Sequence, residues 1–392
     1  MIDSLYLAWQ YLRFNKARTL ILVSCITIIA ALPMALEILL NESEQQLALR
    51  ADSSPLLVGA KGSALDLVMN SIYFGNEVPE AITMAAVEQV SDTGLAAPIP
   101  LYVRFKARGF PIVGTTLDYF DFRGLQLQQG EMFVMLGQCV IGAEVAMKLN
   151  LKAGDYIVSS PETLFDIAGI YPLKMKIAGV LAPNHSADDL GVFVDIRTAW
   201  VIQGLGHGHK DVTKTTDSSV ILKKDKGNVT ANAKLMQYTE ITAENIDSFH
   251  LHGDPTGFPV TAVLAIPDDD KAGTILQGRY LGKEILHQIV RPKEVIDTLM
   301  ANIFKIRNVL DAVIMLVGTA TLLALILVFS LSLRLREREI DIIFKLGCSR
   351  ATIAKLLGAE ICIITAISLA ICGVLVSLIF HYDQMLVRNL FI

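Results

Sequence analysis

One stretch constrains the fold of this chain more than any other: residues Val309 to Leu333 contain a single charged residue, Asp311, near their start. A helix needs roughly 20 apolar residues to cross the hydrocarbon core of a bilayer, which is about 30 Å thick, and this stretch supplies them. A basic run, Arg334-Leu-Arg-Glu-Arg, follows at once. Because clustered Lys and Arg stay on the cytoplasmic side of a membrane, the sequence predicts a transmembrane helix over 309–333 that ends in the cytoplasm.

Two further apolar runs predict two more spans. An amphipathic cytoplasmic helix at 1–18 leads into a first span at 19–40, and a third span is expected at 361–380. The first run is too long for the apolar part of a signal peptide, and no A-x-A cleavage pattern follows it, so we expect it to be retained. Residues 381–392 are too few for a fourth span and are expected to form a short outer tail.

The positions of the basic residues predict the orientation. The two segments assigned to the cytoplasm carry most of the Lys and Arg that lie near the apolar runs, which predicts a cytoplasmic N-terminus and an external middle region. The positively charged residues in question are Arg13, Lys16, Arg18, Arg334, Arg336, Arg338, Lys345, Arg350 and Lys355.

Composition agrees with a membrane protein that has a large water-facing part. The chain is 53% hydrophobic and 19% charged, and its apolar excess lies at the two ends. This is too apolar for an ordinary soluble protein. The net charge of −5 offers no basic face, so a nucleic-acid partner is not expected. Cys139 is the single cysteine of the middle region, which excludes a disulfide framework there.

The middle region, 53–291, is predicted to be a mixed α+β domain, because short β-branched runs alternate with turn residues and with two helical patterns. We therefore expect an α-helical membrane protein with a large α+β extracytoplasmic domain, flanked by stalk helices at 41–52 and 292–308. The predicted helices are Glu80–Gln89 and Glu144–Leu149. The predicted strands are Leu56–Val58, Leu101–Phe105, Ile112–Val113, Val140–Ile141, Tyr156–Val158, Lys176–Val180, Val192–Val194, Ser219–Leu222 and Thr261–Ile266.

Catalytic and nucleotide-binding motifs are missing from the sequence. It contains no G-x-x-x-x-G-K-[ST] loop, so it has no P-loop for ATP phosphates, and any ATP must bind to a partner chain. It also contains no G-x-S-x-G or H-E-x-x-H pattern. We therefore expect a subunit that is not an enzyme and binds no cofactor for catalysis.

Three stretches together resemble the MacB/FtsX-like family of ABC transporter permeases, which is grouped with the lipoprotein-releasing permeases. They are Ala8–Leu20, with Arg18-Thr-Leu at the start of the first span; Val140–Asp155, followed by Lys176–Leu181; and Arg336–Arg350 after the second span. The third stretch is the most specific, and the order and spacing of all three carry the resemblance. Four spans are usual in that family, and three are predicted here.

The resemblance implies a partnership and a mechanism. It implies a bacterial inner-membrane permease with a MacB-like periplasmic core domain at 53–291, paired with a second permease copy or a paralogue. It also implies a separate ABC ATP-binding subunit, which binds ATP and moves the stalks and the periplasmic domain by mechanotransmission. A periplasmic binding or adaptor protein and membrane lipid complete the expected partners.

The cytoplasmic segment at 334–360 is where such a permease would contact its ATPase. Its apolar residues predict a rigid knob, and Gly347 offers a helix stop. The alternative is an interfacial helix that only lies on lipid. The resemblance points to coupling residues, which are Arg338, Glu339, Ile340, Ile343, Phe344, Leu346, Gly347 and Ser349.

Two H-x-H pairs in the external region suggest metal chemistry. They are His207/His209 and His250/His252. Imidazoles two residues apart on a strand point to the same side, so two pairs supply enough ligands for a tetrahedral zinc ion. Further ligands could come from Asp254, His185, Asp188 and Asp189. The alternative is that these are surface histidines that bind no metal.

The sequence thus leads to a permease subunit that couples ATP hydrolysis on a separate chain to motion of its periplasmic domain, for transport or extraction of a substrate, with a link to divalent metal handling. A second hypothesis is a membrane scaffold or regulator that uses an ATPase to activate a periplasmic partner. A third is a membrane sensor whose external domain binds a metal or a ligand.

Overall fold

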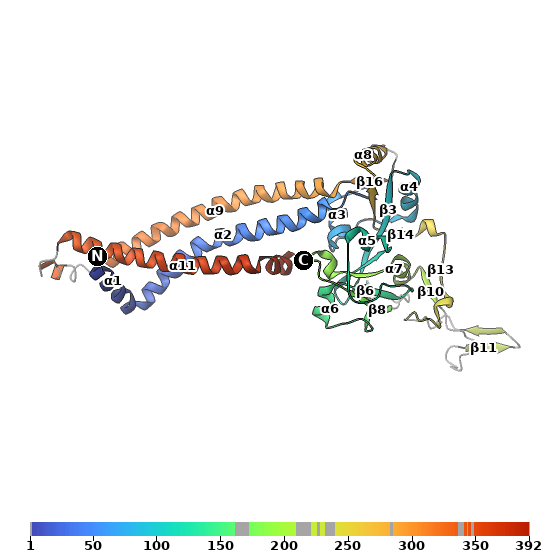
Figure 1. Ribbon diagram of the computed structural model, residues 1–392, viewed down its shortest axis with the longest axis horizontal. Coiled ribbons are helices and arrows are strands. Elements are labelled where there is room, and N and C mark those ends of the chain that lie inside the picture. The colour runs from blue at the N-terminus through green and yellow to red at the C-terminus, as the bar shows by residue number, and fades with distance from the viewer. Residues whose placement is uncertain are drawn as a thin grey trace. The chain divides into compact units, whose positions relative to one another are not determined.

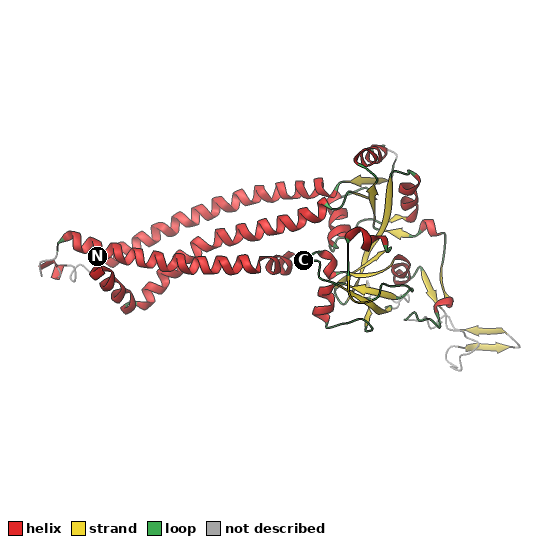
Figure 2. Ribbon diagram, viewed as in Figure 1, coloured by secondary structure: helices red, strands yellow, loops and turns green. Residues whose placement is uncertain are grey.

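The computed structural model describes residues 2–160, 172–208, 221–225, 228–231, 240–282, 285–335, 341–342, 344–345 and 349–391. The chain divides into two units. We call residues 48–299 the core domain, and residues 1–47 together with 300–392 the helical unit. Figure 1 labels the elements along the chain, and Figure 2 shows that the strands among the described residues lie in the core domain.

The helical unit contains the helices α1 (Ile2–Phe14), α2 (Lys16–Asp52), α9 (Pro292–Leu335) and α11 (Arg350–Phe391). Among the described residues two helices are long and apolar enough to cross a membrane, Lys16–Asp52 and Ala351–Tyr382. The predicted span at 309–333 lies in α9, where the described residues include the apolar run Asp311–Ala324. Two long apolar helices thus flank the core domain in sequence, and the third span stays a prediction.

Within the helical unit, α11 packs against α1 and the first half of α2. Leu12, Leu22 and Ile364 are buried in their contact. The buried Thr27 Oγ1 donates a hydrogen bond to the Ser368 carbonyl at 3.4 Å. Hydroxyls that bond across helices hold such bundles together where both helices are apolar.

One large sheet forms the centre of the core domain, in the order β16-β1-β15-β3-β4-β9-β6-β8-β5, with β7 also paired to β8. Its pairs are antiparallel except β4–β9 and β6–β8, which are parallel. The strands of this sheet are β1 (Leu56–Ala60), β3 (Ala96–Ala107), β4 (Phe110–Thr115), β5 (Leu127–Gly130), β6 (Gln138–Ile141), β7 (Tyr156–Val158), β8 (Lys174–Leu181), β9 (Val192–Asp195), β15 (Ala262–Pro267) and β16 (His287–Val290).

Eight of the nine predicted strands coincide with strands of this sheet, which confirms the mixed α+β domain. The ninth, Ser219–Leu222, lies partly outside the described residues, and its described part begins β11 (Ile221–Asp225), which pairs with β12 (Asn228–Ala231). Two further small ladders join β10 (Gly206–Gly208) to β13 (Phe249–Leu251) and β2 (Ile82–Thr83) to β14 (Pro259–Val260).

Helices and short 3-10 turns connect the strands. The predicted helix Glu144–Leu149 is confirmed as α6 (Ala143–Leu149). The prediction Glu80–Gln89 began too early, because Ile82–Thr83 first pair as β2, and Thr83 is extended (φ −113°) before α4 begins. The helical segments are α3 (Ala64–Tyr73), α4 (Met84–Asp92), α5 (Asp118–Arg123), α7 (Ile196–Gln203), α8 (Asp270–Arg279), η1 (Ala187–Leu190), η2 (Ile246–Ser248) and η3 (Pro255–Gly257).

The chain enters and leaves the core domain through neighbouring strands. The last residue of α2, Asp52, shortly precedes β1, and β16 shortly precedes α9. β1 and β16 pair antiparallel, with Leu57 opposite Val290. The ends of both helices that belong to the core domain are therefore attached at the same edge of the sheet.

Candidate functional site

A buried arginine marks the point where α2 meets the core domain. Arg50 lies in the last turn of α2, and its side chain is 8% exposed. Its Nη1 donates to Asp188 Oδ2 at 2.7 Å and its Nη2 to Asp188 Oδ1 at 2.9 Å. This bidentate fork is the strongest geometry available to a guanidinium and a carboxylate. Asp188, from η1, is 1% exposed, so the ion pair is shielded from water.

The other N–H groups of the guanidinium also find acceptors. Nε of Arg50 donates to the carbonyl of Ile72 in α3, Nη1 to Ser186 Oγ at 3.2 Å, and Nη2 to the Tyr119 hydroxyl of α5 at 3.2 Å. With the two bonds to the carboxylate, all five guanidinium donors are used. The Phe74 ring centroid lies 5.5 Å from the guanidinium carbon, a cation–π contact. One side chain of α2 therefore joins three separate elements of the core domain.

The electrostatics of this cluster favour the charged pair. Burial alone would raise the pKa of Asp188, but the charge and hydrogen bonds of Arg50, with the Tyr119 hydrogen bond of 2.7 Å, hold it below the ordinary aspartate value. Burial, with the negative charge of Asp188 adding to it, raises the pKa of Tyr119 to about 12. Asp188 is therefore an anion and Tyr119 a neutral donor at neutral pH.

The turn that presents Asp188 is itself fixed. The carboxylate of Asp189 accepts the backbone N–H groups of Asn184 and His185, each at 2.9 Å. The N-terminus of α6 lies directly on this turn, since an added Cβ at Gly142 would collide with the carbonyl oxygens of Asp188 and Asp189. The carboxylates of Asp188 and Asp189, considered above as additional metal ligands, are thus engaged by protein donors.

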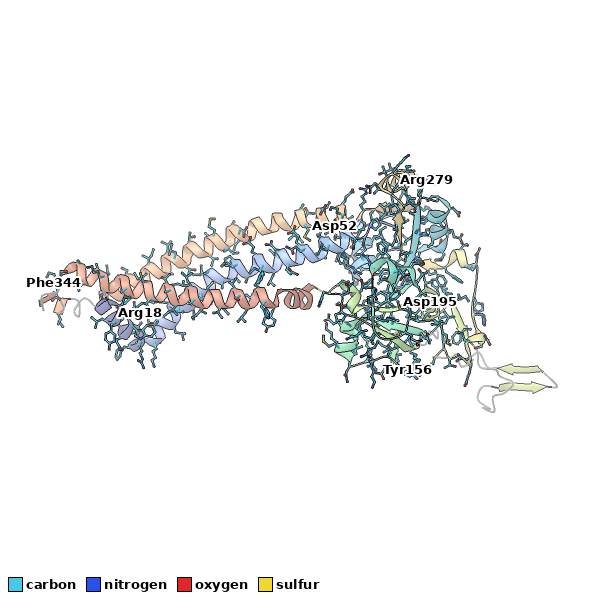
Figure 3. All side chains as sticks on the ribbon, in the orientation of Figure 1. Arg18, Asp52, Tyr156, Asp195, Arg279 and Phe344 are labelled. Carbon is cyan, nitrogen blue, oxygen red and sulfur yellow. The ribbon has the colours of Figure 1, made fainter. Side chains whose placement is uncertain are left out.

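Two more contacts attach the end of α2. Arg123 of α5 donates from its two terminal nitrogens to Ser53 Oγ at 2.9 Å and Ser54 Oγ at 2.8 Å, just after the helix. On the exposed side, Lys293 at the start of α9 forms an ion pair with Asp52, the last residue of α2. Its Nζ lies 2.7 Å from Asp52 Oδ1, and Figure 3 labels Asp52. We call the residues Arg50, Tyr119 and Asp188 the anchor. The three side chains of the anchor bond to one another and hold the end of α2 in the core domain.

Only a small part of the predicted coupling loop lies among the described residues. Phe344, labelled in Figure 3, is 47% exposed, on a short stretch where Lys345 and Asp341 form an ion pair of 2.7 Å. Ser349 precedes α11, and its Oγ accepts the Thr352 backbone N–H at 3.2 Å, which caps that helix. The remaining predicted coupling residues, Arg338, Glu339, Ile340, Ile343, Leu346 and Gly347, lie outside the described residues.

One histidine from each predicted pair lies on one of two neighbouring strands. His207 of β10 is the register partner of His250 in β13, and the His250 and His252 rings lie 4.6 Å apart between centroids. His209 lies outside the described residues. The carboxylate of Asp254, another ligand considered above, accepts a backbone N–H within its own turn. Within the described part of the chain, no group of three or more His, Cys, Asp or Glu side chains is arranged to hold a metal ion.

Sequence patterns did not reveal the anchor. Arg50 stands in a polar stalk, where an arginine is ordinarily solvated, and its partner Asp188 lies far along the chain. One signal in the sequence was the apolar stripe along the stalk. Leu47 belongs to this stripe, and Arg50 follows it one helical turn later, where the stalk meets the external region. A second signal was the Ser186-x-Asp188 pattern, which is typical of a tight turn with a fixed carboxylate.

Comparison with known proteins gives a family and distant structural similarity. Residues 19–237, more than half of the chain, match the model of the MacB-like periplasmic core domain. The periplasmic region of MacB from Actinobacillus actinomycetemcomitans is similar at 12% identity and a TM-score of 0.34, over 65% of this chain and 98% of that one. The extracellular domain of the noncanonic ABC-type transporter YknZ from Gram-positive bacteria is similar at 12% identity and a TM-score of 0.33, over 60% and 98%. The comparison with curated proteins gives no significant match.

Proposed function

The chain belongs to the family with a MacB-like periplasmic core domain, and from this premise we propose that it is the permease subunit of an ABC-type transporter whose ATP-binding subunit is a separate chain. The family match carries the proposal. The absence of a P-loop from the sequence agrees with it, because ATP must then bind elsewhere. The subunit is non-catalytic, and the cargo it serves is not defined by the family.

The proposal includes a membrane topology. Spans at 19–40, 309–333 and 361–380 place the N-terminus and the loop 334–360 in the cytoplasm and the region 53–291 in the periplasm of the inner membrane. The basic residues beside the spans support this orientation. The two helices Lys16–Asp52 and Ala351–Tyr382 support membrane anchoring by their length and composition. A second permease copy or a paralogue completes the assembly.

The anchor suggests how motion reaches the core domain. The helix α2 extends from Lys16 to Asp52 with Pro33 inside it, so its predicted span and the anchor belong to one helix. Displacement of that helix by the ATPase cycle would act on Arg50 and, through it, on the elements that hold Asp188 and Tyr119. Such a displacement would reach the anchor along this one helix, in which Pro33 marks the position of a kink.

The proposal is tested in the loop that would contact the ATPase. The detergent-solubilised chain is purified together with its ATP-binding partner, and ATP hydrolysis is compared with that of the isolated partner. We expect Phe344→Asp to abolish the stimulation, because a charge would replace an exposed apolar contact. Leu281→Asp, at an 84% exposed residue of the core domain, is the matched control and should retain it. Full stimulation with Phe344→Asp, or failure of any ATPase to co-purify, would count against the proposal.

A further inference from the structure

The two outermost strands of the large sheet differ in how their free edges are protected. The strands β16 and β5 stand at the two ends of the strand order. A free edge exposes backbone N–H and C=O groups that can pair with another strand, and natural proteins usually block such edges with charges, proline or a bulge. In β5 the register with β8 shifts between Leu127 and Gln129, and Gly130 then has a positive φ of 76°. The edge at β5 is therefore irregular, which opposes the addition of a further strand.

The edge at β16 has none of these features. Its four residues, His-Gln-Ile-Val, include no Lys, Arg, Asp, Glu or proline, and its register with β1 is regular from Leu57–Val290 to Ala60–His287. Burial lowers the pKa of His287, so the strand is uncharged at neutral pH. Among the described residues β16 pairs with β1 alone. Hydrogen-bonded and non-hydrogen-bonded pairs alternate along an antiparallel ladder, so part of the backbone groups of β16 point away from β1.

An exposed leucine lies directly beside this edge. Leu286 precedes β16 and is 82% exposed. Residues two and four apart along a strand share a face. When β16 is continued by one residue, Leu286 therefore shares a face with Gln288 and Val290, whereas Ile289, which packs against the core, belongs to the other face. The free edge thus combines unblocked backbone groups with an apolar side chain that the core domain leaves in water.

From these observations we infer that β16 pairs antiparallel with β16 of a second copy of this chain, which joins the two sheets into one across a twofold axis. The inference rests on the proposed function, in which a second permease copy completes the assembly. The strand is uncharged, so two copies meet without the repulsion of like charges placed opposite each other. After pairing, both outer edges of the joined sheet are the irregular β5, so the assembly closes at two copies and does not grow into a filament.

The symmetry of such a pair limits its register. Because two kinds of pair alternate along an antiparallel ladder, a twofold axis must pass through a residue that faces its own copy. The two central residues of β16 are Gln288 and Ile289. With the axis at Gln288, Leu286 of each copy faces the partner's Val290, so the same apolar contact forms twice. With the axis at Ile289, Leu286 would face Pro292, where the strand has ended and α9 begins. We therefore assign the axis to Gln288, the register that buries the exposed leucine.

The length of the ladder determines where the pairing is expected. Stable interfaces bury about 1,200–2,000 Å², and a pair of four-residue strands is short for such an area. A single residue, Arg291, separates β16 from α9, and α9 contains the predicted span 309–333. Two copies held in one membrane would meet at a high effective concentration, which favours a short ladder. We therefore expect the pairing between membrane-embedded copies of the full chain.

Cysteine cross-linking of the full chain in isolated membranes tests the pairing. The five native cysteines are replaced by alanine, and Gln288→Cys is introduced. Directly opposed residues of an antiparallel pair have Cβ atoms about 4.5–5.5 Å apart, and a disulfide needs about 3.5–4.5 Å, so a small adjustment permits the bond. The membranes are treated with a mild oxidant before detergent is added. Gln129→Cys, an exposed glutamine at the opposite edge of the sheet, is the matched control.

We expect Gln288→Cys to give a covalent dimer that a reducing agent separates, and Gln129→Cys to remain monomeric. Addition of Leu286→Lys should lower the cross-linked fraction several-fold, because a charge on an edge strand opposes pairing. Leu281→Lys, at an 84% exposed residue outside the ladder, should leave the fraction unchanged. Both lysines replace exposed side chains, so the thermal unfolding temperature should stay the same in both variants.

Three results would overturn the inference: no covalent dimer with Gln288→Cys, equal cross-linking with Gln129→Cys, or cross-linking that Leu286→Lys leaves unchanged. A cross-linked product that contains a different polypeptide, identified by its mass, would overturn the choice of a second copy. A failure of the proposed function is distinguishable, because it appears as an ATPase that does not co-purify or is not stimulated. The cross-link, in contrast, is measured on the chain itself.

Discussion

Replacing Arg50 by methionine is the most direct perturbation of the anchor. Methionine keeps an unbranched side chain of similar length but removes the charge and all five donors. Asp188, at 1% exposure, would then keep its negative charge with only hydroxyl donors from Tyr119 and Ser186 nearby. Breaking a buried ion pair by removing one partner costs about 3–5 kcal/mol. The same change at an exposed pair costs roughly 0–1 kcal/mol.

The structure supplies the matched control for this comparison. Arg197 also makes a bidentate contact with a carboxylate, that of Asp195, with both bonds at 2.9 Å. The side chain of Arg197 is 56% exposed, however, whereas that of Arg50 is 8% exposed. Arg197→Met therefore measures the loss of an ion pair with the same bidentate geometry at a solvent-exposed position. For a domain of 150–250 residues each kcal/mol corresponds to roughly 2–4 °C, so we expect a decrease of roughly 6–20 °C for Arg50→Met and at most a few degrees for Arg197→Met.

Tryptophan fluorescence provides the assay. The chain has two tryptophans, Trp9 in α1 and Trp200 in α7. A Trp9→Phe background leaves Trp200, which is 5% exposed and donates to the Pro259 carbonyl at 2.8 Å, as the reporter of the core domain. Thermal unfolding followed by this single fluorophore then measures the domain that contains the anchor.

A double substitution separates the ion pair from simple loss of packing. Asp188→Asn alone leaves a buried guanidinium without its counter-ion, and we expect it to destabilise the domain by a similar amount. Arg50→Met combined with Asp188→Asn leaves no unpaired charge, so its effect should be clearly smaller than the sum of the two single effects. Strict additivity, or a shift for Arg50→Met no larger than that for Arg197→Met, would refute the assignment of Arg50 as a charged anchor.

Two further predictions concern the surroundings of the anchor. Gly142→Ala should destabilise the core domain by about 1–3 kcal/mol, because the new methyl group would collide with the turn that holds Asp188. The control is Gly278→Ala, in an open position on α8. In the same unfolding assay it should be neutral or stabilising by up to about 1 kcal/mol. Burial raises the pKa of Tyr119 in the folded state to about 12. Since an unfolded tyrosine titrates near 10, the stabilisation from neutral Tyr119 is complete below about pH 10 and is lost as the pH rises toward 12. A spectrophotometric titration of the phenolates counts the tyrosines that ionise only at high pH, and this number should be lower by one in Tyr119→Phe than in the unaltered chain. An unchanged number would contradict the raised pKa of Tyr119.

Local patterns in the sequence were sufficient for much of the core domain. Strands such as Val192–Val194 and Tyr156–Val158 were predictable because their β-branched and aromatic residues are flanked by turn residues, a signal that depends only on neighbours in the chain. The helix α7 was not predicted, because its apolar residues also fit a strand. The feature that identifies it as a helix is its N-cap, Asp195, whose carboxylate accepts the Arg197 N–H. Aspartates that could form such a cap occur at many places in the sequence, so this one did not stand out.

The anchor could not be predicted in the same way. Whether Arg50 is solvated or buried depends on where η1 and α5 fold back onto the end of α2, and no periodicity in the stalk reports that. The histidine pairs were visible in the sequence, but the direct opposition of His207 and His250 depends on the register of two strands separated by more than forty residues. Most of the predicted coupling loop lies outside the described residues, so its role stays a prediction.

The pairing of β1 with β16 limits the kinds of motion that the core domain can receive. Neighbouring strands of a sheet are held about 4.8 Å apart by their hydrogen bonds. The chain enters the domain just before β1 and leaves it just after β16, and Lys293 bonds to Asp52 at that margin. Separating the two attachment points would require breaking the hydrogen bonds of this ladder, starting at the Leu57–Val290 pair, so the ladder holds the two points together. Under the proposed function, a force that reaches the core domain through α2 or α9 therefore acts at this edge of the sheet, and β5 lies at the opposite edge.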